Sequence, residues 1–177
     1  MNRASEKLAA IVGRANAVFP TAGESFNAYL HDETYLRGSA DLVLQPASAA
    51  EVCAVVEALN NLRAQFPAAQ NNLSLTMRGG GSGLSGACVP ASGIVLDLTR
   101  MDRIVDIDPR NQVIRAECGV ILAALNGALS GTGLHYPGDP SSLSLCTVGG
   151  SIATNAAGPA SLKYGTTRDY LAQAKLV

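Results

Sequence analysis

The 177-residue sequence has no tryptophan and is poor in aromatic residues, which make up 5%, and in charged residues, which make up 15%. Hydrophobic residues make up 47%, which excludes a disordered chain and favours a packed globular domain. The 13 basic and 14 acidic residues give a formal net charge of −1, so no basic excess is available to bind nucleic acid or an anionic membrane. The length predicts about one domain with room for a second small lobe.

Long hydrophobic runs and paired cysteines are missing as well. No apolar run reaches the roughly 18 residues that a membrane span needs, so no transmembrane segment is expected. The first 20 residues contain no uninterrupted apolar region of the length found in a secretory signal and predict an amphipathic helix instead. The cysteines form no Cys-x-x-Cys pair, which favours reduced packing thiols in the cytosol over a zinc site or a disulfide framework. They stand at Cys53, Cys88, Cys118 and Cys146.

The first half of the chain predicts helices around one short strand, followed by a second strand. Residues 41–46 predict a strand that Pro46 ends, and residues 73–77 predict another. Between them, Ser48 and Glu51 form a capping-box pattern that begins a helix, and Pro67 ends this helix. Strand, helix and strand in this order indicate a βαβ unit. The apolar stripe expected on the first helix is Leu8, Ile11, Val12, Ala15 and Val18. The stripe expected on the second helix is Val52, Val55, Val56, Leu59 and Leu62.

The second half predicts strands followed by a charge-poor region. Residues 94–98 predict a strand, and residues 104–108 and 113–117 predict a hairpin around the turn at 109–112. A short helix with an apolar stripe follows. Asp139 is the only charged residue between Glu117 and Lys163, which favours a stretch covered by core, by another domain or by a bound cofactor. The stripe of the short helix is Ile121, Leu122, Leu125 and Leu129.

Fifteen of the 18 glycines follow residue 78, and five of them lie in the sequence RGGGSGLSG at residues 78–86. Glycines directly after a strand let backbone N–H groups converge on an anion, which predicts a phosphate cradle; the alternative is a flexible turn between strands. The loop contains Gly-x-Gly-x-x-Gly, but Pro90 opposes the helix that a dinucleotide-binding βαβ unit needs. No acidic residue ends a second strand at the required distance. A nucleoside-triphosphate loop is excluded because no Gly-Lys-Ser/Thr sequence is present.

A second cluster of small residues follows in YPGDPSS at 136–142 and CTVGGSIATNAAG at 146–158. Gly149 and Gly150 permit close approach of the backbone to a flat ring or a pyrophosphate, and Thr147 and Asn155 have side chains that can hydrogen-bond a ligand. The alternative is a buried cluster of loops that binds nothing. Two glycine clusters in one small chain favour a single long ligand that contacts both.

Five segments resemble, in unbroken order, the flavoprotein family of vanillyl-alcohol oxidase and p-cresol methylhydroxylase. They are RGGGSGLSGA, IVLDLTRMDRIVDID, YPGDPSS, CTVGGSIATNAAG and LKYGTTRDY, and the resemblance extends from about residue 41 to residue 177. Within that family the chain is similar to the glycolate oxidase flavoprotein subunit and to FAD-linked D-lactate and D-2-hydroxyglutarate dehydrogenases. The resemblance implies an α+β, two-lobed FAD-binding fold of the p-cresol methylhydroxylase type. It implies a helical lead at 1–37, a first lobe at about 38–98 and a second lobe at about 99–177 that stops before its end.

The resemblance also implies which residues contact non-covalently bound FAD. The backbone cradle for the pyrophosphate would be Arg78, Gly79, Gly80, Gly81, Ser82, Gly83, Leu84 and Ser85. The nucleotide and flavin channel would be lined by Pro137, Asp139, Pro140 and Ser141. Its wall would continue through Thr147, Gly149, Gly150, Ala153, Asn155 and Gly158.

Three further residues are assigned roles on the same basis. Members of the family that link flavin to a histidine carry that histidine where Ser82 stands, and serine cannot form the link. Cys146 is expected to pack beside the flavin. His31 is expected at the surface of the helical lead, and His135 is expected to have a packing role.

The activity that the resemblance implies is oxidation of a 2-hydroxy acid of the glycolate, D-lactate or D-2-hydroxyglutarate class by hydride transfer to flavin. An iron–sulfur protein or another partner would accept the electrons, and the enzyme would be cytoplasmic, free or peripheral at the inner face of a membrane. The catalytic residues, any metal ligands and the substrate-binding domain are expected beyond these 177 residues, which alone are expected to be inactive. The alternatives are a sugar or lactone oxidase of the same superfamily and a non-catalytic FAD-binding or interaction module.

Overall fold

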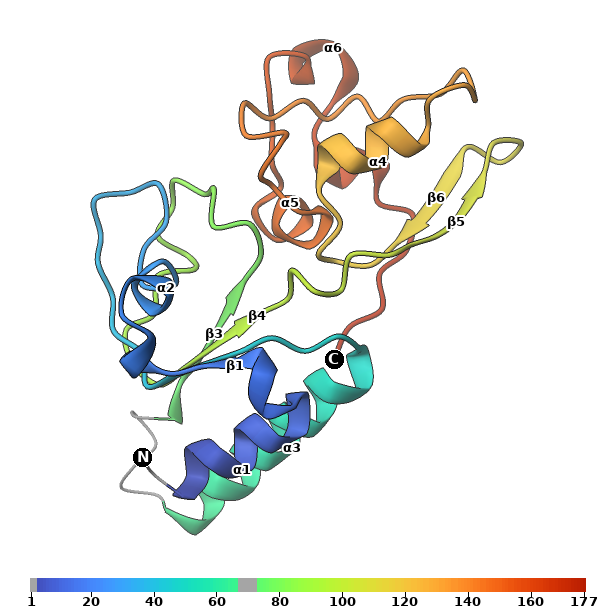
Figure 1. Ribbon diagram of the computed structural model, residues 1–177. Helices are drawn as coiled ribbons and strands as arrows, with labels where there is room; N and C mark the ends of the chain where they lie inside the picture. The colour runs from blue at the N-terminus through green and yellow to red at the C-terminus, as the bar shows by residue number, and fades with distance from the viewer. Residues whose placement is uncertain (1–2, 67–72) are drawn as a thin grey trace. The chain divides into compact units, whose positions relative to one another are not determined.

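The computed structural model describes residues 3–66 and 73–177, and the chain divides into two compact units (Figure 1). The first unit comprises residues 1–100 together with Val177, and the second comprises residues 101–176. The helical lead predicted for residues 1–37 is included in the first unit.

A four-stranded sheet organises the first unit. Its strands are β1 (Ala17–Val18), β2 (Leu42–Leu44), β3 (Leu75–Arg78) and β4 (Ile94–Asp97). Their order is β1-β2-β4-β3, with β2, β4 and β3 parallel and β1 antiparallel to β2. All residues of β2 and β4 are buried, in keeping with the apolar runs Leu42–Leu44 and 94–96, and β4 ends at the buried Asp97.

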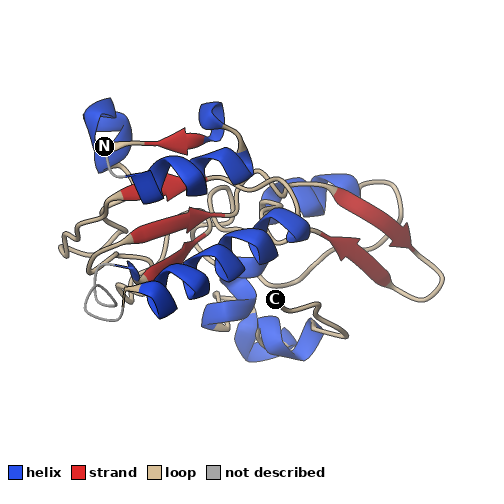
Figure 2. Cartoon of the chain, turned by 90° about the horizontal axis from the view of Figure 1, so that it is seen from below, coloured by secondary structure: helices blue, strands red, loops and turns tan. Residues whose placement is uncertain are grey.

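Helices cover both faces of this sheet. Figures 1 and 2 show α1 (Arg3–Val12) and α3 (Ala49–Gln65) on one face and the short α2 (Glu24–Asn27) on the other. On the α2 face, Phe26 packs against Val43 and Val95. The predicted βαβ unit is present as β2, α3 and β3, and β4 lies between its two strands.

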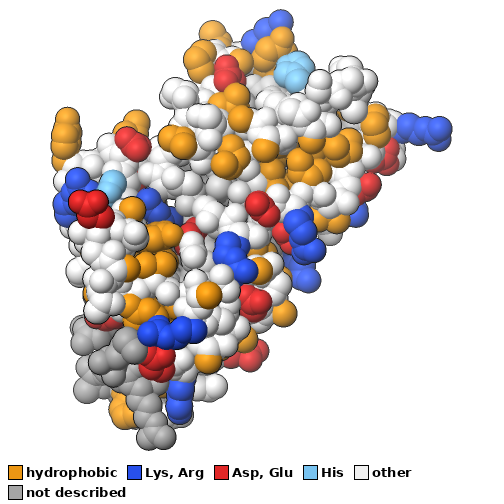
Figure 3. All heavy atoms as spheres, in the orientation of Figure 1, with side chains coloured by type: hydrophobic (Ala, Val, Ile, Leu, Met, Phe, Trp, Pro, Cys, Tyr) orange, Lys and Arg blue, Asp and Glu red, His pale blue; other side chains and the backbone are white. Residues whose placement is uncertain are grey.

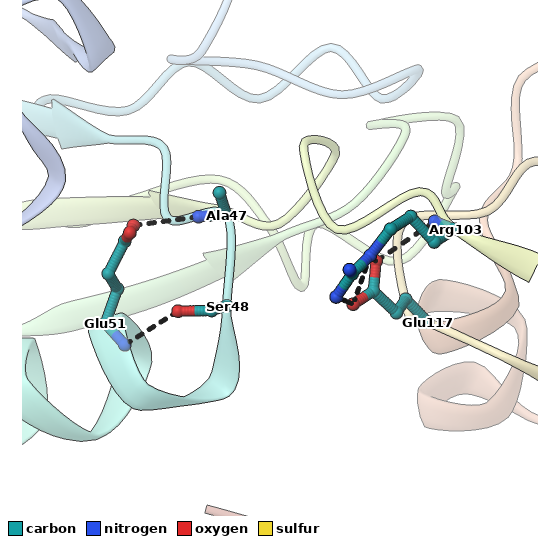
Figure 4. A network of polar contacts seen from close by, with 5 residues as sticks. All are labelled: Ala47, Ser48, Glu51, Arg103 and Glu117. Atoms are coloured by element: carbon teal, nitrogen blue, oxygen red, sulfur yellow. Dashed lines mark hydrogen bonds and ion pairs between the residues drawn. The ribbon is translucent and has the colours of Figure 1, made fainter. Parts of the chain in front are cut away.

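The start of α3 confirms the capping-box prediction with one difference. Ser48 Oγ accepts a hydrogen bond from the Glu51 N–H at 3.2 Å. Glu51 Oε2 accepts from the N–H of Ala47 at 2.9 Å, one residue before the capping serine (Figure 4). The helix ends at Gln65, and the Pro67 proposed to end it lies outside the described residues.

The first helix is shorter than its apolar stripe predicted. It ends at Val12 because Gly13 follows in the left-handed region, with φ of 82°. Ala15 lies in the short 3-10 helix η1 (Arg14–Asn16), and Val18 lies in β1, so the prediction of one helix through Val18 is wrong. A second 3-10 helix, η2 (Pro20–Ala22), leads to α2.

The second unit begins with the predicted hairpin, β5 (Ile104–Asp108) and β6 (Val113–Ala116), which are antiparallel. Three short helices follow, α4 (Leu122–Ala128), α5 (Val148–Thr154) and α6 (Ser161–Tyr164), and then the 3-10 helix η4 (Thr167–Tyr170). The core of this unit is built by Val120, Leu125 and Leu129 against the inner face of the hairpin. Ile121 was predicted on the buried stripe of α4 but is 38% exposed, because it caps the helix in an extended conformation.

An ion pair closes the open end of the hairpin. The guanidinium of Arg103 donates to the carboxylate of Glu117, with Nη2 2.7 Å from Oε1 (Figure 4). The Arg103 N–H also donates to Glu117 Oε2, at 3.0 Å. Hydrogen bonds from Arg103 hold the pKa of Glu117 below its usual value of 4.5.

Within residues 3–66 and 73–177, no helix is both long and apolar enough to cross a membrane.

Candidate cofactor-binding site

The glycine loop, residues 79–86, follows β3 at the carboxyl end of a parallel strand, where open α/β sheets bind ligands. Within residues 3–66 and 73–177, no atom accepts a hydrogen bond from the backbone N–H groups of residues 79–85. A backbone donor needs an acceptor, and a run of neighbouring N–H groups suits an anion. The described chain therefore leaves these N–H groups available to a ligand, and the phosphate cradle stays a prediction.

Arg78 anchors the start of the loop through its side chain. Its Nη1 donates to the backbone oxygen of His31 at 2.7 Å, and Nη2 donates to that of Ala28 at 3.1 Å. The guanidinium lies against Gly81, so that a Cβ at position 81 would be 2.1 Å from Nη2. Gly81 also has φ of 68°, so its backbone conformation favours glycine, and a side chain at this position would displace the Arg78 guanidinium.

Asp32 anchors the end of the loop from the segment that precedes β2. Its Oδ2 accepts from the Gly86 N–H at 3.0 Å, and its Oδ1 accepts from the Thr34 N–H and hydroxyl at 2.9 and 2.5 Å. The Glu33 N–H donates to the oxygen of Gly83 at 3.2 Å. Residues 28–34 are called the bracing segment below, and in Figure 1 the blue chain after α2 runs beside the green chain after β3.

The charges of these groups follow from their surroundings. Burial raises the pKa of Asp32, but hydrogen bonds from Thr34 and Gly86 outweigh this effect and leave the pKa below its usual value of 3.8. Asp32 is therefore a carboxylate at neutral pH. Burial raises the pKa of the Cys88 thiol, which lies 3.5 Å from Arg78 Nη1 and 4.0 Å from Asp32 Oδ2. Cys88 is therefore a neutral thiol rather than a nucleophile.

In the second unit, two of the predicted ligand segments contact each other. A Cβ at Gly158 would lie 1.6 Å from the backbone oxygen of Asp139 and 2.9 Å from the nitrogen of Pro140. The Gly158 N–H donates to Ser161 Oγ at 2.8 Å. The chain therefore needs glycine at position 158 for its own packing.

The first turn of α5 is likewise occupied by protein contacts. Thr147 is 1% exposed, and its Oγ1 accepts from the Gly150 N–H at 3.2 Å. The N–H groups of Val148 and Gly149 donate to the backbone oxygens of Val120 and Cys118, each at 2.8 Å. The Thr147 hydroxyl thus caps α5, and the two amides hold α5 against the chain that follows β6.

The end of α5 is fixed by Asn155. It adopts the left-handed conformation with φ of 48°, and its Oδ1 accepts from the Arg168 N–H at 2.9 Å.

The remaining predicted residues differ in their exposure to solvent: Ala153 and Ser141 are exposed, whereas Pro140 is fully buried. Cys146 is buried, as expected of a packing thiol.

A cavity of about 210 Å³ within the second unit contains two of the predicted residues, Pro137 and Asp139. Asn126 orders one wall, because its side chain accepts from the N–H of Tyr136 and donates to the oxygen of the same residue. The lining residues are Asn126, His135, Tyr136, Pro137, Asp139, Ala160 and Tyr164.

The two histidines lie in different surroundings, and neither belongs to a metal-binding group within the described residues. His135 is exposed and meets Tyr164 edge to face, with ring centroids 6.4 Å apart. His31 is half-buried in the loop after α2 rather than in a helix, and its backbone oxygen binds Arg78. In the part of the chain that the structure describes, no three His, Cys, Asp or Glu side chains are grouped to hold a metal ion.

Sequence reasoning missed the bracing segment. Asp32 and Thr34 match the pattern of an aspartate that hydrogen-bonds the backbone two residues later, which is a recognisable local signal. That signal predicts a turn but does not show that the second carboxylate oxygen binds the N–H of Gly86.

Comparison with known proteins identifies the family. A family model described as the FAD binding domain matches residues 40–177, so the chain belongs to this family of FAD-binding domains. FAD is therefore the cofactor, as the sequence predicted, and the unpaired amides of the glycine loop fit its pyrophosphate.

The chain is 36% identical to D-lactate dehydrogenase of Anaerostipes hadrus over 146 residues. This aligned region covers 81% of this chain and 29% of that protein.

Two further relatives carry related names. The chain is 31% identical to the glycolate oxidase subunit GlcD of Bacillus subtilis, over 94% of this chain and 33% of that one. It is 35% identical to D-2-hydroxyglutarate dehydrogenase of Xanthomonas citri pv. viticola, over 75% of this chain and 26% of that one. The chain thus spans about a third or less of the length of these curated relatives.

Solved structures confirm the fold. Alkyldihydroxyacetonephosphate synthase aligns with a TM-score of 0.78 at 22% identity, covering 96% of this chain and 31% of that one. p-Cresol methylhydroxylase aligns with a TM-score of 0.70 at 17% identity, covering 89% of this chain and 30% of that one. The α+β fold of the p-cresol methylhydroxylase type, predicted from five short segments, is therefore correct.

Proposed function

We propose that this chain is the FAD-binding part of an oxidoreductase that oxidises a 2-hydroxy acid of the glycolate, D-lactate or D-2-hydroxyglutarate class. The observation that carries the cofactor assignment is the run of N–H groups at residues 79–85 without partners in the described chain. The names of three relatives support the substrate class.

The role of this chain's residues in that reaction is binding and orientation. The glycine loop donates its amides to the pyrophosphate, and Arg78 and Asp32 hold the two ends of the loop so that its N–H groups remain available. We further assign Pro137 and Asp139, which line the cavity of the second unit, to the cofactor channel. Asp139, Ser141 and Ala153 are exposed and free to meet a ligand, whereas Thr147, Gly149 and Gly158 shape the backbone around them.

Bound FAD supplies the hydride acceptor, which no amino-acid side chain provides. Turnover also requires an electron acceptor, for which we propose an iron–sulfur protein or another redox partner. A cytoplasmic location, free or peripheral at the inner face of a membrane, stays a prediction.

The cofactor assignment is tested by titrating the 177-residue chain with FAD and with ADP, which carries the pyrophosphate without the flavin ring. We expect saturable binding of both and competition between them. Failure of both ligands to bind would overturn the assignment of the glycine loop.

The substrate class is tested on the natural gene product by dye reduction with glycolate, D-lactate and D-2-hydroxyglutarate, with sugars and sugar lactones as the comparison. Turnover of a hydroxy acid supports the proposal. Turnover of sugars or lactones alone would place the protein with the sugar and lactone oxidases, and FAD binding without any turnover would make it a non-catalytic module.

A further inference from the structure

We propose that Asp32 is a positioning residue for the FAD pyrophosphate: its carboxylate holds the Gly86 end of the glycine loop so that the loop amides stay directed at the ligand. The inference rests on the proposed function of the glycine loop. It assigns a role in cofactor binding to a residue that lies 54 positions before Gly86 and outside every glycine-rich motif.

The hydrogen bonds of Asp32 bridge two separate parts of the chain. Oδ1 takes both donors from Thr34 within the bracing segment, and Oδ2 takes its donor from Gly86. Two backbone N–H groups thus require an acceptor from this one side chain, which is 4% exposed. Asparagine is the same size but has one acceptor oxygen, so it leaves one of these N–H groups facing its own NH2 group.

Asp32 is the side chain by which the bracing segment holds the far end of the loop. Arg78 fixes the near end by binding the backbone oxygens of Ala28 and His31, and Glu33 contributes only its backbone N–H to Gly83. Without the Asp32 contact, residues 84–86 have no hydrogen bond to the bracing segment within the described chain. A loop that is held in its binding conformation before the ligand arrives binds more tightly, because less ordering accompanies binding.

The negative charge of Asp32 weakens anion binding, whereas its positioning of the loop strengthens anion binding, so the two effects can be distinguished by experiment. A carboxylate near a pyrophosphate repels it, so loss of the charge alone strengthens anion binding. If Asp32 acts by position, Asp32→Asn weakens anion binding even though it removes a negative charge. If Asp32 acts only through its charge, the same substitution strengthens binding.

Glu33→Gln is the matched control. It removes the same charge one residue away, from a side chain that is exposed, and leaves intact the backbone bond from Glu33 to Gly83. Riboflavin provides a second control, because it carries the flavin ring without a pyrophosphate. General damage to the fold affects riboflavin and ADP together, whereas loss of loop position affects ADP.

The experiment measures dissociation constants of FAD, ADP and riboflavin for the 177-residue chain and its variants by calorimetry, at low and at high salt. We expect Asp32→Asn to raise the dissociation constants of ADP and FAD by about tenfold, since a buried hydrogen bond to a charged group is lost. We expect riboflavin affinity to be unchanged, and Glu33→Gln to stay within about twofold of the parent chain. The weakening persists at high salt because it does not arise from charge.

One result overturns the inference while leaving the proposed function intact: the parent chain binds ADP, and Asp32→Asn binds ADP as tightly or more tightly. If the parent chain itself binds neither ADP nor FAD, the proposed function fails. Should Asp32→Asn not fold, Thr34→Val replaces it, because it removes the hydroxyl that donates to Oδ1 and orients the carboxylate towards Gly86, while the charge of Asp32 is kept. We then expect ADP binding about threefold weaker, and an unchanged affinity overturns the inference.

Discussion

Gly81 shows how one residue of the loop meets two requirements at once. Alanine at this position would adopt a left-handed conformation that costs about 1 kcal/mol and would displace the Arg78 guanidinium from the bracing segment. We expect Gly81→Ala to lower the melting temperature and to weaken FAD binding about tenfold or more. Calorimetric melting and FAD titration measure both effects.

Gly127→Ala is the control for this change, because position 127 is exposed in α4 and a Cβ there meets nothing within 4 Å. It is expected to bind FAD as the parent does. A Gly81→Ala variant with normal FAD affinity would show that the loop is a simple turn.

Asp32 also predicts how stability depends on pH. Its pKa in the folded chain is lower than the usual 3.8, so the folded state binds this proton less readily than the unfolded state. The resulting stability is fully present above the unfolded value and is lost as the pH falls through the lower folded value. We expect the free energy of unfolding, measured in urea, to decrease from pH 5 towards pH 3.

The Asp32→Asn variant should be less stable than the parent chain at neutral pH and should lose less stability on acidification. Glu117 contributes in the same direction, because its pKa is also lowered. Arg103→Met removes that contribution and leaves the contribution of Asp32. Equal acid sensitivity of the parent and Asp32→Asn would contradict the assignment.

Ser82 predicts the mode of flavin attachment. The family resemblance implies that Ser82 stands where other members carry a histidine linked to flavin, and a serine hydroxyl cannot form that link. After reconstitution with FAD and precipitation with acid, we expect the yellow colour in the supernatant. A yellow pellet after washing would contradict a non-covalent cofactor.

The glycine loop could be predicted because its glycines are adjacent in the sequence. The contacts that hold the loop in place could not be predicted, because they come from residues far away in the sequence. Five glycines directly after a strand predict an anion cradle by composition alone. The contacts of Arg78 with Ala28 and His31 join residues that are 50 and 47 positions apart. No sequence pattern near Arg78 or near these two residues indicates the contacts.

Among the elements, the packing of Gly158 on Asp139 fixes the loops that flank α5. A methyl group at 158 would lie 1.6 Å from a backbone oxygen, and neither chain segment has a flexible end that can move away. We expect Gly158→Ala to reduce the free energy of unfolding by about 1–3 kcal/mol, measured by urea denaturation.

The same Gly127→Ala substitution serves as the matched control, because it is expected to stabilise α4 by about 1 kcal/mol. A Gly158→Ala chain as stable as the parent would mean that the two loops do not pack as described.

One helix is shorter than predicted, and another helix was not indicated by the sequence, each for a physical reason. The apolar stripe of α1 continued past Gly13, but that glycine turns the chain into the left-handed region and the later stripe residues join other elements. The sequence did not indicate the helix α5, because its segment contains two adjacent glycines, which disfavour a helix. The cap from Thr147 and the contacts of Val148 and Gly149 with the preceding chain stabilise this helix. The ligand wall expected of the same segment stays a prediction.

At the scale of the whole molecule, the charge-poor stretch predicted in the sequence leaves apolar side chains exposed on the second unit. Figure 3 shows hydrophobic side chains gathered on the face of this unit that is in view. Leu145 is 55% exposed and Leu162 is fully exposed. Exposed apolar surface drives association.

We therefore expect the 177-residue chain to associate as its concentration rises, measured by light scattering after size-exclusion chromatography. Leu145→Asp combined with Leu162→Asp should shift the chain towards the monomer. The exposed Val105 of the hairpin offers a control, because Val105→Asp adds one charge on a different element. A parent chain that stays monomeric at all concentrations would contradict this prediction.

The strand order β1-β2-β4-β3 has a consequence for synthesis on the ribosome. β4 is made last of the four strands yet lies between β2 and β3, so neither neighbour has its parallel partner until residues 94–97 have left the exit tunnel. Leu44 precedes Ile94 by 50 positions, and at about 5–20 residues per second the edge of β2 that later pairs with β4 stays open for several seconds. The glycine loop emerges during this interval, before β4 has paired with β3 and fixed the strand from which the loop begins. The bracing segment has already been synthesised by then, so it is the part of the nascent chain available to hold the loop.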